Sequence, residues 1–295
     1  MQAGSATSLW VLVIKMFTLF SCPKPFTDPH TTTIQRNAIT SWTLLDPKPE
    51  IILFGDETGM PEICQELKLC CVPQVARNEW GTPLVNVIFE KAVQVASHDF
   101  LCYVNADIIL MEDFLHAFER VRSYGDEWLM VGSRVDIDIT NPLNFNDKEW
   151  QKKLRLLVKE KGTPMEWSSD YFVFRKGFFD TSVMPPFALG RLAYDNWFFW
   201  YARHKRASII DASKVVLATH QNHRFSQSWQ EVQRSSEKNR NCNLAGIWAC
   251  SFILSDATHE LSVQGIKGRI FRSFFNRFNV CMGIMNNFLR TLYRK

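Results

Sequence analysis

The sequence lacks the features that mark several common classes of protein. It contains no run of about 20 apolar residues, the length that a membrane-spanning helix needs, because Lys15 interrupts the apolar stretch SLWVLVIKMFTLFSC. The segment before this stretch, MQAGSATS, carries no charge, whereas a signal peptide has a basic region there. The 8 cysteines form no CxxC pair and no His/Cys cluster with zinc spacing. We therefore expect no membrane span, no signal peptide and no structural zinc.

A strong excess of charge is also missing. The formal net charge of +4 is small for 295 residues, so we expect no nucleic-acid partner, although the chain would accept a phosphorylated ligand. The hydrophobic fraction of 46% and the charged fraction of 22% are those of a globular protein with a substantial core. Because we interpret the scattered cysteines as reduced thiols, we expect a cytoplasmic protein.

What is present is an alternation of short apolar strands and amphipathic helices. In the first half the pattern predicts strands at 16–22, 50–55, 71–75 and 100–104, and helices at 33–45, 61–69 and 83–97. The less regular second half predicts strands at 129–135, 171–175, 207–211 and 215–219, and helices at 147–161 and 192–204. Alternating strands and helices form βαβ units. The sequence therefore predicts an α/β fold whose mostly parallel central sheet is flanked by helices.

A carboxylate lies between two apolar runs in FLCYVNADIILMEDF, residues 100–114. An unpaired buried charge is costly, but ligands of an open α/β sheet lie outside the carboxyl ends of its strands. Residues two apart in extended backbone point the same way, so Asn105 and Asp107 could both face a crevice. There Asp107 would hold a divalent cation against phosphate oxygens. The alternative is that Asp107 caps a helix that begins near Met111.

The order and spacing of several motifs resemble the GT-A type glycosyltransferases, specifically the family-2-like group of nucleotide-diphospho-sugar transferases. Similar to its nucleotide-sugar half are PKPF at 23–26, IQRNAITSW at 34–42, LFGDETG at 53–59, RNEWGTPLVN at 77–86 and YVNADIIL at 103–110. Similar to its acceptor half are SDYFVF at 169–174, YDNW at 194–197 and THQNH at 219–223. The resemblance implies a GT-A, Rossmann-like sheet with a smaller mixed sheet on the acceptor side. The group's Asp-x-Asp hallmark is present in a DXD-like form, with Asn105 in the first position.

This resemblance also implies an organisation of the chain. Residues 16–243 would form the catalytic domain, with a nucleotide-binding half at 16–110 and an acceptor half at 111–243. Residues 1–15 would form an N-terminal extension, and residues 244–295 a helical, basic and aromatic extension. The tail from 261 to 295 could contact an anionic membrane as an amphipathic helix, which would make the protein peripheral to that membrane. The alternative is a helix packed on the catalytic domain.

For the donor, the resemblance implies a set of nucleotide-sugar-binding residues: Pro23, Lys24, Asp56, Arg77, Asn78, Asn105 and Asp107. The first three would hold the base and its ribose, and Arg77 would contact phosphate ahead of the helix predicted from Pro83. Ordinary turn chemistry at Asp56 and a surface role for Arg77 are the alternatives.

For the reaction, the resemblance implies that Asp195 deprotonates the acceptor hydroxyl as that oxygen attacks the anomeric carbon. His220, or second to it His223, would complete the shell of a Mn²⁺ or Mg²⁺ ion held by Asp107. Asp170 and Trp197 would contact the acceptor. Each residue also has a structural interpretation: a first-turn acid at a helix terminus for Asp195, a structural imidazole for His220, and packing for Asp170 and Trp197.

The sequence thus predicts a metal-assisted glycosyltransferase that moves a sugar, with inversion, from a nucleoside-diphosphate sugar to a hydroxyl acceptor. The acceptor could be a glycan, a lipid or a small molecule. A catalytically silent nucleotide-sugar-binding protein is the main alternative, and Asn105 is the residue that favours it. A nucleotidyltransferase would normally have a Gly-rich loop after the first strand, where this chain has PKPFTDPH. A membrane-surface scaffold would act through the tail.

Overall fold

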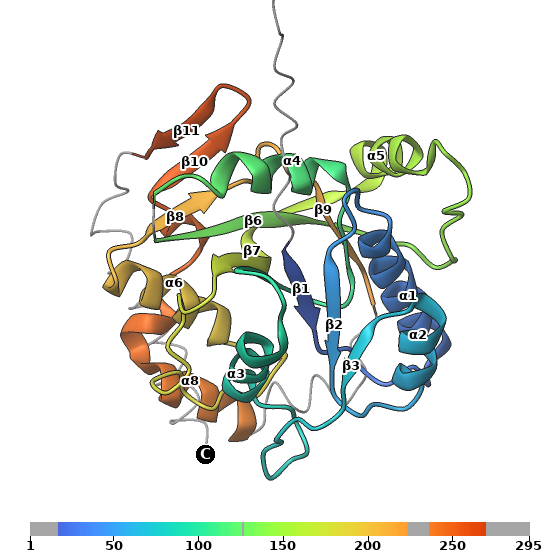
Figure 1. The fold of residues 1–295 in the computed structure, drawn as a ribbon. Helices are drawn as coiled ribbons and strands as arrows, with labels where there is room; N and C mark the ends of the chain where they lie inside the picture. The colour runs from blue at the N-terminus through green and yellow to red at the C-terminus, as the bar shows by residue number, and fades with distance from the viewer. Residues whose placement is uncertain (1–16, 126, 224–235, 270–295) are drawn as a thin grey trace, which may run out of the picture.

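The computed structural model describes residues 17–125, 127–223 and 236–269, and its centre is an eleven-stranded sheet (Figure 1). The strands are β1 Thr18–Ser21, β2 Glu50–Phe54, β3 Cys70–Val72, β4 Phe100–Val104, β5 Ile108–Ile109, β6 Trp128–Ile137, β7 Thr163–Arg175, β8 Ser208–Asp211, β9 Ala218–Gln221, β10 His259–Ser262 and β11 Gly265–Gly268. The helices are α1 Pro29–Thr43, α2 Met60–Leu67, α3 Val85–Val95, α4 Glu112–Val121, α5 Trp150–Lys161, α6 Tyr194–His204 and α8 Ser236–Cys250, with a short 3₁₀ helix, η1, at Leu254–Asp256.

The strand order is β11-β10-β8-β6-β7-β4-β1-β2-β3, and β5 and β9 branch off beside β6. Six of the ten strand pairings are parallel. The antiparallel strand β7 lies between β4 and β6, so that β4 and β6 run in the same direction. The prediction of an α/β fold with a mostly parallel central sheet is therefore confirmed. The smaller mixed sheet expected on the acceptor side is not separate, because β5 and β9 belong to the same sheet.

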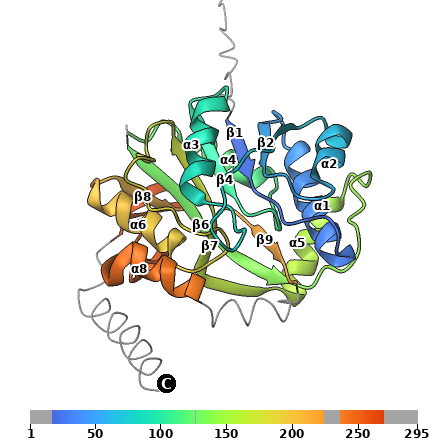
Figure 2. The ribbon, with the colours of Figure 1, turned by 90° about the horizontal axis from the view of Figure 1, so that it is seen from below.

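Helices cover both faces of this sheet (Figures 1 and 2). One apolar core lies under α1, α2 and α4, and a second lies under α3, α6 and α8. Alternation along the strands supplies both cores: Leu19 of β1 points to the first, and its neighbour Phe20 points to the second. A strand buried on both faces reads as a continuous apolar run, as β4 does in FLCYV.

Two local differences from the sequence prediction have clear physical causes. Helix α1 begins at Pro29, four residues earlier than predicted, because Asp28 caps it by accepting a hydrogen bond from the Thr31 amide at 2.7 Å. Proline is also tolerated at the first helical position. Strand β9 begins at Ala218 and runs to Gln221, so His220 lies within the strand and not after it.

The C-terminal part of the described chain also differs from the prediction. The helical extension expected from residue 244 is wrong here, because α8 ends at Cys250 and the hairpin β10–β11 follows. The polar strand HELS of β10 is stabilised by parallel pairing with β8, which its own sequence does not signal. The expected extension at 1–15 and most of the basic tail, 270–295, lie outside the described residues.

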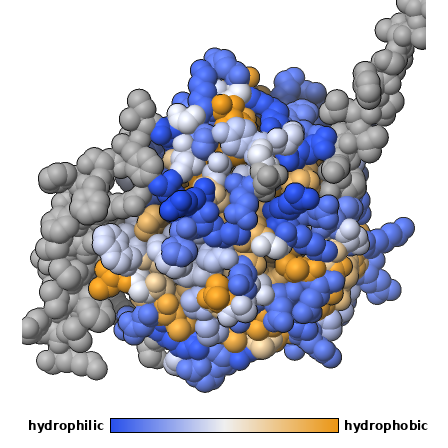
Figure 3. All heavy atoms as spheres, turned by 60° about the vertical axis from the view of Figure 1, so that its left-hand side comes forward, coloured by the Kyte–Doolittle hydropathy of each residue, from blue (hydrophilic) through white to orange (hydrophobic). Residues whose placement is uncertain are grey.

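The surface of the described part shows no membrane-spanning feature: none of its helices combines the length and apolarity needed to cross a bilayer. Hydrophobic and hydrophilic side chains are interspersed on the face shown in Figure 3.

Candidate active site

A cavity of about 650 Å³ opens where β1 and β4 end and α6 begins. Its walls come from both predicted halves of the chain. Pro23 and Lys24 line it after β1, Asn105 and Asp107 line it after β4, and Asp195 lines it from the first turn of α6. The volume is typical of a site for a small-molecule ligand.

Asp107, His220 and His223 form a cluster in this cavity. Their ligand atoms all lie within 4.8 Å of one another. Asp107 Oδ2 is 3.6 Å from His220 Nε2 and 3.4 Å from His223 Nε2. Antiparallel pairing of Ile108 with His220 brings β5 and β9 together, and this register places the carboxylate beside the imidazole.

The cluster is suited to a divalent cation. Asp107 Oδ1 is buried and has no hydrogen-bond partner among the described residues, so this carboxylate keeps an oxygen available for a ligand. Burial opposes ionisation of Asp107, but its contacts with His220 and His223 hold its pKa well below the usual range. One carboxylate and two imidazoles suit Mn²⁺, which accepts both oxygen and nitrogen ligands. The alternative of a helix cap is excluded for Asp107, since Met111 is the N-cap of α4 and no side chain bonds there.

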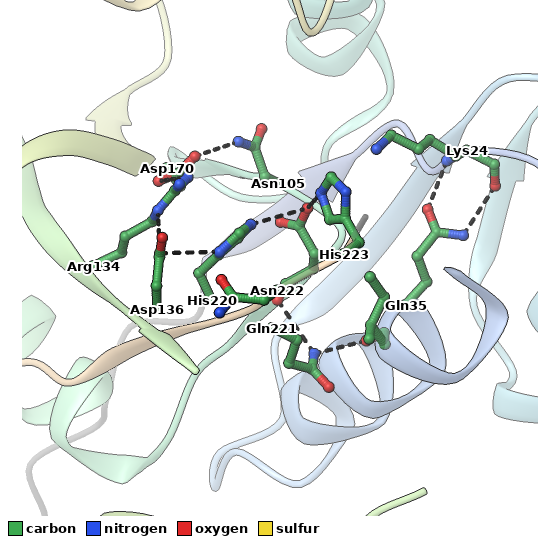
Figure 4. A network of polar contacts seen from close by, with 12 residues as sticks. Lys24, Gln35, Asn105, Arg134, Asp136, Asp170, His220, Gln221, Asn222 and His223 are labelled. Carbon is green, nitrogen blue, oxygen red and sulfur yellow. Dashed lines mark hydrogen bonds and ion pairs between the residues drawn. The ribbon is translucent and has the colours of Figure 1, made fainter. Parts of the chain in front are cut away.

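Asp136 and Arg134, on β6, lie beside His220 on the side away from Asp107 (Figure 4). Parallel pairing sets Asp136 directly beside His220, and Asp136 Oδ1 lies 3.0 Å from His220 Nδ1. Arg134 donates from Nε to Asp136 at 2.7 Å and from Nη1 to Asp170 at 2.9 Å. Burial lowers the pKa of His220, but its contacts with Asp107 and Asp136 outweigh that effect and raise it to about 9. Because the Asp136 carboxylate lies beside Nδ1 of His220, the other ring nitrogen, Nε2, faces Asp107.

Asn105 and Asp170 are bound mainly to the protein itself. Asn105 donates from Nδ2 to Asp170 Oδ1 at 2.6 Å and accepts from the Tyr103 hydroxyl at 2.9 Å. With Arg134 on its other oxygen, Asp170 has both carboxylate oxygens occupied. Burial raises the pKa of Asp170, against the lowering effect of Arg134. Both residues line the cavity, yet their polar atoms form an internal network.

Asp195 has a different environment. It follows Ala193, whose φ of 87° turns the chain sharply into α6, and it faces the cavity partly exposed. Loss of hydration raises its pKa to about 6, despite a hydrogen bond from the Asn196 amide. A carboxylate with a raised pKa is a stronger base than an ordinary one, which suits it to accept a proton near neutral pH.

The predicted donor residues divide into two groups. Pro23 and Lys24 line the cavity, and the backbone of Lys24 is fixed by Gln35, which accepts from its N–H at 2.6 Å and donates to its C=O at 3.0 Å (Figure 4). Arg77 also lines the cavity, and it donates to Asp56 at 2.6 Å and to Glu57 at 2.7 Å.

Asp56 and Asn78 are not part of the cavity wall. Asp56 is exposed and holds Arg77. The side-chain oxygen of Asn78 accepts from the amides of Trp80 and Thr82 and so shapes the loop. Both residues therefore act indirectly on the cavity, through Arg77 and through the loop.

Trp197 is not where the acceptor prediction requires it. Its side chain is 4% exposed and stacks on Tyr201 with 4.8 Å between ring centroids, on the core side of α6. It does not line the cavity. Position 197 lies two residues after Asp195, which places it on another side of the helix. The packing interpretation describes this residue.

Arg134 and Asp136 were missed by sequence reasoning, although a signal exists. In the strand sequence SRVDIDI, charged residues occupy alternate positions between apolar ones. This alternation marks one polar face of a strand. Because the partners of that face lie far away in the sequence, the pattern alone does not identify which site it serves.

Comparisons with known proteins identify several similar solved structures. No family model and no curated protein matches the sequence. Glucosyl-3-phosphoglycerate synthase from Mycobacterium tuberculosis, in complex with Mn²⁺, UDP and phosphoglyceric acid, is 12% identical over 79% of this chain and 79% of that chain, with a TM-score of 0.45. A mannosyltransferase from Pyrobaculum calidifontis, in complex with GDP-Man and Mn²⁺, is 12% identical over 80% of this chain and 72% of that chain, with a TM-score of 0.43. The similarity concerns the arrangement of strands and helices.

Proposed function

We propose that this protein is a glycosyltransferase that moves a sugar from a nucleoside-diphosphate sugar to a hydroxyl acceptor, with inversion at the anomeric carbon. One observation carries the proposal: a cavity at the carboxyl ends of parallel strands contains both a carboxylate–imidazole cluster and a separate carboxylate of raised pKa. The first can hold a cation and a diphosphate, and the second can accept a proton.

Asp107 and His220, with His223, would hold the Mn²⁺ or Mg²⁺ ion. When bound, such an ion neutralises the charge that develops on the leaving diphosphate. Lys24 would add a positive charge to that of the metal ion, since its ammonium is close enough to lower the pKa of Asp107. Pro23 and Arg77 belong to the wall where the nucleoside would lie.

Asp195 is assigned the role of general base. The acceptor oxygen forms its bond to the anomeric carbon while the bond between that carbon and the diphosphate oxygen breaks. The acceptor proton passes to the Asp195 carboxylate, and the nucleoside diphosphate leaves with the electron pair. Attack from the face opposite the leaving group gives inversion. Asp170 and Asn105 then serve to shape the site, since their polar atoms bond to one another.

The test is donor turnover by the full chain. UDP- and GDP-sugars, each with and without Mn²⁺, are first screened for a rise in melting temperature, because a ligand of the native state raises stability. Release of the nucleotide from the stabilising donor is then measured. Asp195→Ala should keep donor binding and lose about 10²–10⁴-fold in turnover, which is the usual contribution of a general base. Asp107→Ala should lose the metal-dependent part of binding.

The surface variant Glu160→Gln, on α5, is the matched control and should behave like the wild type. Undiminished turnover in both Asp variants would reject the assigned roles. Metal-dependent donor binding without any turnover would instead support the silent nucleotide-sugar-binding protein.

A further inference from the structure

A second cavity, of about 610 Å³, lies on the opposite face of β6 from the candidate active site. Arg134 faces the first cavity, while its neighbours Ser133 and Val135 line the second, as alternation along a strand requires. The two cavities share no lining residue. Asp211, the last residue of β8, lies in the wall of the second one, so this cavity is also outside the carboxyl end of a parallel strand.

One wall of this cavity is an ion-pair network that satisfies its own charges. Arg269 bonds to Asp211 at 2.5 Å and to Glu260 at 3.2 Å, and Lys214 lies 2.8 Å from Glu260. Asp211 accepts a further bond from the amide of Ser213 at 2.9 Å. Because each charge has a partner, this wall does not require an ionic ligand.

The opposite wall contains Glu166 and Trp167, which come from a register shift in the pairing of β7 with β6. Ser133 pairs with Ser169, but the next residue, Arg134, pairs with Met165. Residues 166–168 are therefore left outside the ladder. Such bulges re-aim side chains, and they are common beside functional sites.

Glu166 and Trp167 of this bulge both line the cavity, and Trp167 is 69% exposed. Within the described residues, the Glu166 carboxylate forms no hydrogen bond or ion pair, and the Trp167 indole makes no ring contact. An exposed indole beside an unpaired carboxylate is thus held over a cavity of ligand size.

We propose that this second cavity binds a saccharide. Trp167 would stack on the apolar face of a sugar ring, since an indole offers a rigid apolar surface with a polar N–H at its edge. Glu166 accepts hydrogen bonds only, and sugar hydroxyls donate them.

The charges of the wall disfavour an anionic ligand. The lining contains four acids, Glu166, Asp211, Asp256 and Glu260, against two bases, Lys214 and Arg269. This excess of acid disfavours a phosphorylated ligand. The proposal does not depend on sugar transfer in the first cavity.

The test is the binding of neutral tetrasaccharides of glucose, mannose, xylose and N-acetylglucosamine to the full chain. Binding is detected by saturation-transfer NMR of the saccharide, and affinity is then measured by calorimetry. At least one tetrasaccharide should bind, and Trp167→Ala should weaken it about tenfold, the loss expected when an aromatic stacking partner is removed. Trp248→Ala removes an indole that is 62% exposed on α8 and should leave the affinity unchanged.

Several outcomes would overturn the proposal. These are no binding by any of the four tetrasaccharides, or equal affinity in the wild type and Trp167→Ala. Spermidine is tested in parallel: if it binds, loses affinity in Glu166→Gln and Trp167→Ala, and no tetrasaccharide binds, the cavity takes an organic cation. Asp107→Ala, in the first cavity, should not alter tetrasaccharide binding. The two tests are therefore independent, and failure of the donor assay would not decide the outcome of this one.

Discussion

At the scale of single residues, Asn105 shows how a changed motif residue can acquire another role. In the Asp-x-Asp pattern its position carries a carboxylate. Here the amide donates to Asp170 and accepts from Tyr103, two bonds that a carboxylate could not make together, because it has no N–H. The amide thus keeps Asp170 in place without adding a second negative charge to a buried site.

Asn105→Asp should therefore destabilise the metal-free protein. It removes the donor to Asp170 Oδ1 and places like charges 2.6 Å apart, at a cost of about 1–3 kcal/mol. Urea unfolding measures the change. Asn144→Asp, in an exposed loop where the side-chain oxygen accepts from Asn146, is the control and should be close to neutral. An Asn105→Asp protein as stable as the wild type would contradict the role assigned to the amide.

Asp136 gives a second prediction at this scale. Its carboxylate lies at ion-pair distance from His220 Nδ1, 3.0 Å, and carboxylate partners set the orientation of a metal-binding imidazole. Asp136→Asn should weaken Mn²⁺ binding about 10–100-fold, measured by calorimetry without nucleotide. Glu160→Gln removes a surface carboxylate and should have no effect. An unchanged Mn²⁺ affinity in Asp136→Asn would show that His220 does not need this partner.

At the scale of elements, the pair β6 and β7 organises the site. Val104 pairs with Tyr171, which brings Asp170 to Asn105, and Asp136 pairs with His220. Gly132 of β6 allows the close approach of this pair. A Cβ at this position would lie 2.2 Å from Tyr171 Oη and 3.0 Å from its Cζ, and Tyr171 is fully buried.

Gly132→Ala should therefore destabilise the fold by about 1–3 kcal/mol, the usual range for overpacking. Gly268→Ala is the matched control on a strand, because the nearest atom to its Cβ would be 4.0 Å away. The Tyr171 hydroxyl has no hydrogen-bond partner among the described residues, so Tyr171→Phe should partly restore the stability of Gly132→Ala. Chemical denaturation is measured for the wild type, Gly132→Ala, Gly268→Ala and the double variant Gly132→Ala/Tyr171→Phe. Equal stability of Gly132→Ala and the wild type would refute the packing argument.

The sequence was informative where one element carries its own signal. The apolar run of β4 and its abrupt end predicted both the strand and the position of Asp107 in the cavity. It was uninformative where a partner distant in the chain decides the outcome. Strand β10 exists through pairing with β8, and Arg134 acquires its role only when β7 and β9 flank β6. For Trp197 the sequence left acceptor contact and packing equally open, because an aromatic residue serves a core and a sugar site equally well.

At the scale of the whole molecule, the cavity exists because the sheet joins two halves of the chain. Residues after β1 and β4 supply the wall with Lys24 and Asp107, and the later segments supply Asp195 and His220. This arrangement places an ionisable group, such as the Asp195 carboxylate, in a partly desolvated cavity, and this lowers the stability of the folded protein. Active sites commonly carry this conflict between function and stability.

Asp195 makes that conflict measurable. Burial raises its pKa from 3.8 to about 6, so the folded state binds its proton more tightly than the unfolded state does. The wild type should therefore lose stability as the pH rises from about 4 to about 6 and keep the full penalty above that range.

Asp195→Asn cannot ionise, and it should be more stable than the wild type at pH 7–8 by about 1–3 kcal/mol. This gain should disappear below about pH 4. Melting temperatures of both proteins across this pH range provide the measurement, with the exposed surface variant Glu160→Gln as control. A gain that does not depend on pH would mean that Asp195 does not titrate as its environment requires, and the assignment of Asp195 as the base would lose its physical support.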